Sequence, residues 1–140
     1  MDDPFVRELL ADHSRNPRQY GTLPEPDIEA ETENPRCVGP THPEGDQVAL
    51  MATLSADRST VETVRFTGCG CTLSQAGASL LTTEMVETPV EAILDWDSET
   101  IEDLVGMELT PARLQCAELV LVAFRDALSD HESDAGPPAE

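Results

Sequence analysis

The chain has 140 residues, a length that suits one domain with its own hydrophobic core. Its formal net charge is −20, and all eight of its basic residues are arginine. So acidic a surface repels phosphate backbones, which excludes nucleic acid as an expected partner. No apolar run is long enough to span a membrane and the N-terminus lacks a signal pattern, so we expect no membrane partner and a cytoplasmic location. We interpret the acidity as halophilic adaptation, because salt screens the repulsion between like charges.

The N-terminal segment predicts a helix over residues 4–13. Pro4 suits the first helical turn, and Asn16-Pro17 ends the helical pattern. The apolar stripe of this helix would consist of Phe5, Val6, Leu9 and Leu10.

Three later segments predict strands, over residues 28–34, 47–54 and 60–66. The middle strand would place Val48, Leu50, Ala52 and Leu54 on one face. Val61 and Val64 are out of strict alternation, which predicts a β-bulge in the third strand. A short turn joins the second and third strands, as in an antiparallel hairpin. The acids of the first strand suit an edge position.

The second half of the chain predicts helices over residues 72–86, 89–94, 97–104 and 110–128. The first of these is rich in small residues around Gly77, which permits close packing on the sheet or close approach to a ligand. The last begins with the cap and first-turn pair Thr110-Pro111. We expect an α+β domain over residues 1–128 and an acidic, disordered tail over residues 129–140.

The four cysteines are the residues most suited to chemistry. In a reducing cytosol, widely spaced cysteines are more often ligands or catalysts than disulfide partners. Cys71 ends the run Gly68-Cys69-Gly70-Cys71 between a strand and a helix, and a thiol at a helix N-terminus is favoured as thiolate. Cys37 lies in a proline-rich loop, and Cys116 lies one turn into the last predicted helix. We expect Cys37, Cys71 and Cys116 to converge on one metal or cluster site.

Three thiolates leave one tetrahedral position for a harder ligand. Asp46 is the first choice because it closes the loop that holds Cys37, and His42 in the same loop is the second. Two of the candidate residues also have a plainer interpretation. His42 could be an exposed loop histidine, and Cys116 could be a small core residue. The role of Cys69 stays open among three alternatives: an additional ligand, a resolving thiol, or a small residue that fills the turn.

Four segments of the chain match the motifs of one known family. Residues 12–18 read Asp-His-Ser-Arg-Asn-Pro-Arg, residues 34–37 read Asn-Pro-Arg-Cys, Gly70-Cys71 starts a helix, and residues 111–116 read Pro-Ala-Arg-Leu-Gln-Cys. With these motifs, in this order, the chain from about Val6 to Leu128 resembles the U-type iron–sulfur cluster scaffolds. That family includes IscU, SufU and the N-terminal domain of NifU.

The resemblance implies a fold and a ligand set. The family fold is α+β, with a small three-stranded antiparallel sheet, helices packed on it and a site exposed at one end. The ligands carried over by resemblance are Cys37, Asp46, Cys71 and Cys116. In the family the aspartate follows the first cysteine by two residues, whereas here residues 38–45 intervene, so His42 stays an alternative.

The resemblance also implies a function. A scaffold of this family accepts sulfur from a cysteine desulfurase, here on Cys116 or Cys71, binds iron and passes a 2Fe–2S cluster to acceptor apo-proteins. The alternative is a zinc-dependent sulfurtransferase of the SufU type. A third hypothesis is a structural zinc module, in which the metal only holds the fold together. Gln115 replaces the histidine of the IscU branch, and the span from Cys71 to Cys116 is too short for the SufU insertion. The branch, the question of carrier or enzyme, and the oligomeric state therefore stay open.

Overall fold

The computed structural model describes residues 4–40 and 43–135, and it contains one antiparallel sheet with strands in the order β1-β2-β3. The strands are β1 (Ile28–Asn34), β2 (Asp46–Leu54) and β3 (Val61–Cys69). Asn34 pairs with Asp46 at one end of the sheet, so the 35–45 loop leaves and re-enters at adjacent positions. The predicted α+β fold with a small three-stranded antiparallel sheet is confirmed.

The alternation predicted for β2 is confirmed, with Val48, Leu50, Ala52 and Leu54 all buried. The predicted bulge is confirmed as well. Thr53 pairs with Thr63 but Leu54 pairs with Val61, so Glu62 is an extra residue on β3. Because of this irregularity, Val61 and Val64 can both face the core, where both are fully buried.

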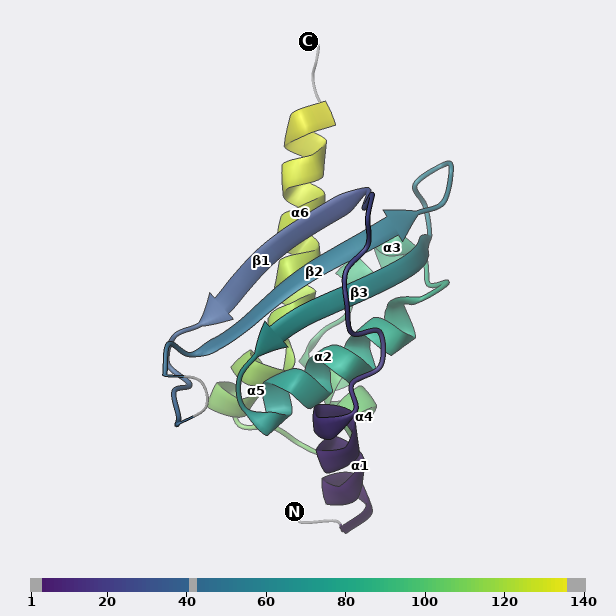
Figure 1. Cartoon of the computed structure of the whole chain (residues 1–140). Helices are drawn as coiled ribbons and strands as arrows, with labels where there is room; N and C mark the ends of the chain where they lie inside the picture. Colours follow the sequence, from purple (N-terminus) through teal and green to yellow (C-terminus); the bar gives the residue numbers. More distant parts are fainter. Residues whose placement is uncertain (1–3, 41–42, 136–140) are drawn as a thin grey trace.

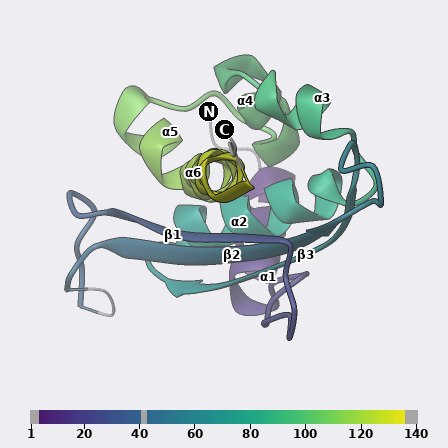
Figure 2. The same ribbon diagram turned by 90° about the horizontal axis from the view of Figure 1, so that it is seen from above.

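Helices α2 (Thr72–Met85) and α6 (Leu119–Ala135) pack on the sheet, with α6 along β1 and β2 and α2 along β3 (Figures 1 and 2). Helix α1 (Pro4–Arg15) packs on α2. The shorter helices α3 (Val90–Leu94), α4 (Ser98–Val105) and α5 (Pro111–Ala117) complete the fold. Asp97 caps α4, because its side chain accepts the N–H of Thr100.

The prediction of one last helix ending at residue 128 was wrong. The helix is interrupted at Glu118, whose N–H donates to the carbonyls of Leu114 and Cys116, and α6 then continues to Ala135. The predicted tail thus begins inside α6, and residues 136–140 lie outside the described part of the chain. None of the described helices is both long enough and apolar enough to cross a membrane.

Helix α1 does not bury the whole of its predicted apolar stripe. Phe5 is 87% exposed and Leu9 is 39% exposed, so these two members of the stripe were wrongly assigned to the interior. The buried residue of α1 is His13, whose Nδ1 lies 2.7 Å from the hydroxyl of Ser79 on α2. The same hydroxyl accepts the N–H of Arg18 at 2.8 Å. A polar contact therefore joins α1 and the segment after it to α2.

Gly77 lets α2 approach α5 closely. A Cβ atom at this position would lie 2.7 Å from the carbonyl oxygen and 3.0 Å from the Cα of Ala117. Ala117 follows Cys116, so this approach fixes where α5 presents its cysteine. The small residues of this helix were predicted to allow either close packing on the sheet or close approach to a ligand. At Gly77 the structure shows close packing, but against helix α5 and not against the sheet.

We expect the free energy of unfolding to decrease as the pH falls below about 6.5, the ordinary pKa of histidine. Burial, and secondly the Arg18 cation, lower the pKa of His13, so the unfolded chain takes up a proton before the folded chain does. The stability present above that pH is then lost as the pH falls toward the lowered pKa. Urea denaturation of wild type and His13→Gln at about pH 7.5 and about pH 5.5 tests this. Carboxylates titrate alike in both proteins, so equal pH dependence in the two would contradict it.

We expect Gly77→Ala to destabilise the protein. In an open helix this change stabilises by roughly 0.5–1 kcal/mol, but overpacking in a tight interface costs about 1–3 kcal/mol. The second effect dominates because the neighbour of the new Cβ is backbone, which cannot rotate away. A urea midpoint above that of wild type would show that the α2–α5 interface has room.

Candidate metal centre

Four side chains from separate segments meet at one end of the sheet. The sulfur atoms of Cys37, Cys71 and Cys116 and a carboxylate oxygen of Asp46 all lie within 4.8 Å of one another. Figure 1 shows the 35–45 loop, the start of α2 and α5 at this end. These are the four residues that the sequence and the resemblance placed together, and the structure brings them together.

The donor set fits a tetrahedral metal ion. Zinc binds thiolate sulfur at about 2.3 Å and carboxylate oxygen at about 2.0–2.2 Å, which puts neighbouring sulfur atoms roughly 3.8 Å apart. The observed limit of 4.8 Å exceeds this by about 1 Å, within reach of small side-chain rotations. Thiolate-rich sites with one harder ligand suit zinc and iron–sulfur clusters alike.

Asp46 is fully buried at the first position of β2. Its Oδ1 accepts the N–H of Cys71 at 2.8 Å, and its Oδ2 lies 3.6 Å from the Cys71 sulfur. The long loop between Cys37 and Asp46 does not displace the carboxylate, because the Asn34–Asp46 pair closes the base of the loop. Gly45 makes this closure possible: its φ is +96°, and a Cβ there would lie 2.5 Å from the carbonyl oxygen of Asn34.

Cys71 is the N-cap of α2, as the sequence predicted. Its sulfur accepts the N–H of Ser74 at 3.4 Å, in the way that an oxygen accepts at an ordinary N-cap. Gly70 lies between this cap and Asp46. A Cβ at Gly70 would be 2.5 Å from Asp46 Oδ1 and 2.6 Å from Ser74 Oγ, so only glycine leaves the carboxylate where it is.

Burial makes two of the thiols poor acids while no cation is near. Burial, and secondly the neighbouring Cys71 thiol, raise the pKa of Cys37 to about 11. Burial also raises the pKa of Cys116, and the adjacent Asp46 carboxylate adds to the effect. A bound cation would reverse this balance by favouring the thiolates, so metal binding at this centre releases protons.

Of the two remaining candidates, the structure describes Cys69 alone, and it lies outside the group of four. His42 is outside the described residues. Cys69 ends β3 opposite Gln47, is exposed, and directs its S–H toward Gln47 Oε1 at 3.9 Å. Gln47 and Asp46 are successive residues of β2, so their side chains leave opposite faces of the sheet. Cys69 is therefore on the outer face, whereas Asp46 faces the helices.

One residue at the centre was missed by the sequence analysis. Asn34 is buried, and its side-chain nitrogen lies 3.6 Å from the sulfur of Cys116. The available signal was its position in the Asn34-Pro35-Arg36-Cys37 run at the end of a strand, but the contact spans 82 positions in the sequence.

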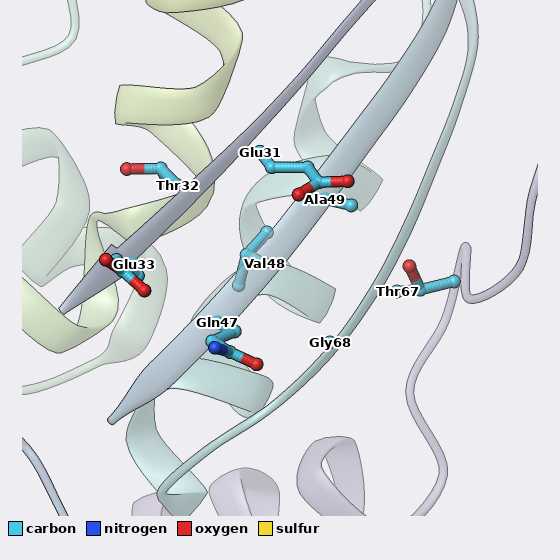
Figure 3. Close-up of a pocket in the computed structure, with 8 residues that line it drawn as sticks. All are labelled: Glu31, Thr32, Glu33, Gln47, Val48, Ala49, Thr67 and Gly68. Atoms are coloured by element: carbon cyan, nitrogen blue, oxygen red, sulfur yellow. The ribbon is translucent and has the colours of Figure 1, made fainter. Parts of the chain in front are cut away.

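A hollow of about 520 Å³ lies over β1, β2 and β3 (Figure 3). Its lining consists of Glu31, Thr32, Glu33, Gln47, Val48, Ala49, Thr67 and Gly68. No cysteine contributes to it, and Figure 3 shows its polar side chains, which are Glu31, Thr32, Glu33, Gln47 and Thr67. The four residues of the candidate metal centre therefore lie outside this hollow.

Comparison with known proteins gives matches over nearly the whole chain. Residues 6–136 match the family of NifU-like N-terminal domains. The zinc-dependent sulfurtransferase SufU of Bacillus subtilis is 30% identical, with 93% of each chain covered. The iron–sulfur cluster assembly scaffold protein IscU of Streptococcus pyogenes is 29% identical, with 86% of this chain and 80% of the relative covered.

Solved structures have the same fold. The SufU of Fervidobacterium islandicum superimposes with a TM-score of 0.67 at 21% identity, covering 86% of this chain and 94% of its own. The N-terminal part of a NifU-like protein of Brucella abortus gives a TM-score of 0.69 at 15% identity, covering 91% and 94%. At these identities the structures support the arrangement of strands and helices alone.

We expect Gly70→Ala to weaken metal binding without unfolding the chain. The added methyl group would displace the Asp46 carboxylate or the Ser74 hydroxyl, and disturbing the support of a metal ligand typically costs 10–100-fold in affinity. Competition with a chromophoric zinc chelator measures the affinity. Thr72→Ala, an exposed neighbour on the far side of Cys71, is the matched control. Wild-type affinity in a folded Gly70→Ala protein would contradict the expectation.

Proposed function

Because the chain belongs to the family of NifU-like N-terminal domains, we propose that it is an iron–sulfur cluster assembly scaffold. One observation carries the proposal: three thiols and one carboxylate from four separate segments lie within 4.8 Å of one another. Family membership alone would not require this arrangement, since the loop before Asp46 is longer than the family pattern. A cysteine desulfurase supplies the sulfur and acceptor apo-proteins receive the product.

Sulfur is a substrate of this scaffold and arrives as a protein persulfide. The thiolate of the accepting cysteine attacks the outer sulfur of the donor persulfide, and the donor sulfur–sulfur bond breaks. The donor leaves as a thiolate and a new persulfide forms on the acceptor, with no net oxidation or reduction. Cys71 is half-buried and its sulfur accepts the Ser74 N–H, whereas Cys116 is only 7% exposed. Accessibility thus supports Cys71 as the first acceptor, ahead of Cys116.

Iron and the assembled 2Fe–2S cluster are cargo that must also leave. Cys37, Cys71 and Cys116 would hold the cluster together with Asp46, and a carboxylate binds iron less firmly than a thiolate does. One weaker ligand suits a protein that gives its cluster away. Cys37 and Cys71 are both half-buried at the end of the sheet, which leaves an approach for an acceptor protein.

The second candidate function is a zinc-dependent sulfurtransferase. It is favoured by the similarity to the SufU of Bacillus subtilis, which covers 93% of both chains. Zinc would then be a resident cofactor held by the same four residues, and it would keep their thiols deprotonated at neutral pH. The chain's own contribution would be to release one thiolate, which accepts the sulfur.

Anaerobic reconstitution distinguishes these functions. We expect the chain, supplied with ferrous iron, cysteine, a cysteine desulfurase and a thiol reductant that reduces persulfide sulfur to sulfide, to develop the visible absorption of a 2Fe–2S cluster and to transfer the cluster to an apo-ferredoxin. Cys71→Ser should abolish both assembly and transfer because it removes a ligand. Cys69→Ser is the matched control: this thiol is two residues away but outside the group of four, so it should leave both unchanged.

Two results would contradict the scaffold. Tight stoichiometric zinc with no transferable cluster would favour the sulfurtransferase. Unfolding of Cys116→Ser, followed by circular dichroism, would favour a structural zinc module, in which the metal supplies the folding energy. A folded Cys116→Ser protein without sulfur chemistry is the outcome that the first two functions share.

A further inference from the structure

The proposed centre concentrates negative charge. Three thiolates and one carboxylate carry four negative charges, and a divalent cation neutralises two of them. The chain as a whole also has a net charge of −20. Anionic ligands in such a place depend on N–H donors, which orient them and stabilise their charge.

Two of the ligands obtain their donor from the main chain of α2. The N–H of Cys71 donates to Asp46 Oδ1, and the N–H of Ser74 donates to the Cys71 sulfur. Both belong to the free N–H groups at a helix N-terminus. Cys116 has no such help, because it lies near the end of α5, past the first turn. Its sulfur instead lies 3.6 Å from the side-chain nitrogen of Asn34.

The amide of Asn34 is held so that its nitrogen faces Cys116. Its oxygen accepts the N–H of Arg36 at 3.4 Å, which leaves the NH₂ group for the sulfur. Its main chain is fixed as well, since its carbonyl accepts the N–H of Cys37 at 3.3 Å and the residue pairs with Asp46. Asn34 is only 8% exposed, so water does not readily replace this donor. One residue thus touches Cys116 and fixes the backbone near two further ligands.

We propose that Asn34 is a positioning residue of the metal centre, whose side-chain amide donates to the Cys116 thiolate and holds it toward the bound ion. The proposal rests on the proposed function only in requiring that the four residues bind metal, whether a cluster or zinc. An N–H donor withdraws electron density from the sulfur, so charge transfer from sulfur to a bound metal then needs more energy. Removing the amide should therefore change the spectrum of the centre as well as its affinity.

Cobalt substitution tests this. Co²⁺ bound by thiolates gives a sulfur-to-metal charge-transfer band, and we expect this band to move to lower energy in Asn34→Leu, which keeps the size but loses the donor. The affinity for Co²⁺ should fall by about tenfold or more, as is typical when a hydrogen-bond partner of a ligand is removed. Asn34→Asp should lose more, because it adds a negative charge beside the thiolate.

Gln47→Leu is the matched control. It removes a side-chain amide at the neighbouring pair of the sheet, but this amide is half-buried on the opposite face and contacts Cys69, which is not one of the four. We expect its cobalt band and affinity to equal those of wild type. Circular dichroism establishes that each variant is folded.

A measurement on the unaltered chain covers the case in which Asn34→Leu does not fold. With cadmium-113 in the centre, a hydrogen bond to a ligating sulfur transmits a scalar coupling between the metal and the Asn34 side-chain protons. Its absence from folded, cadmium-loaded protein would overturn the proposal. So would a folded Asn34→Leu with the wild-type cobalt band and affinity. Wild-type protein with no charge-transfer band would instead overturn the metal centre itself, and the positioning role with it.

Discussion

The structure depends on holding four acidic groups within 4.8 Å of one another in a chain that is already strongly negative. Without a cation, burial keeps the thiols of Cys37 and Cys116 protonated, as their raised pKa values indicate. With a cation, the same burial strengthens every interaction between the ion and its ligands. Burial thus favours neutral thiols when no cation is bound and strengthens the thiolate–metal interactions when one is bound.

The fold meets this constraint by bringing rigid element ends together. Asp46 begins a strand, Cys71 caps a helix, and Cys116 ends a short helix that Gly77 allows to pack tightly against α2. Only Cys37 lies in a long loop, and the Asn34–Asp46 pair anchors that loop at its base. Three of the four residues are therefore placed at the ends of strands and helices, and Cys37 is placed by the loop whose base the Asn34–Asp46 pair closes.

Patterns within short stretches of sequence predicted those features of the fold that depend on neighbouring residues alone. The alternation of β2, the bulge at Glu62 and the cap at Cys71 follow from the order of residues in a short window. The interruption at Glu118 has no proline or glycine to mark it in the sequence. The stripe on α1 misplaced Phe5 and Leu9, because the helix is held through His13 and Ser79, a contact 66 positions apart. Asn34 was missed for the same reason.

The family motifs supplied the non-local information that periodicity lacks. They placed Cys37, Asp46, Cys71 and Cys116 together, although Asp46 follows Cys37 at an unusual distance. Strand pairing explains why that distance matters so little, because extra residues between the paired Asn34 and Asp46 leave these two residues in register. Relatives from the SufU and IscU branches are similar to this chain to nearly the same degree. The four ligands can serve either chemistry, so the choice between them rests on how firmly their surroundings hold the thiolates.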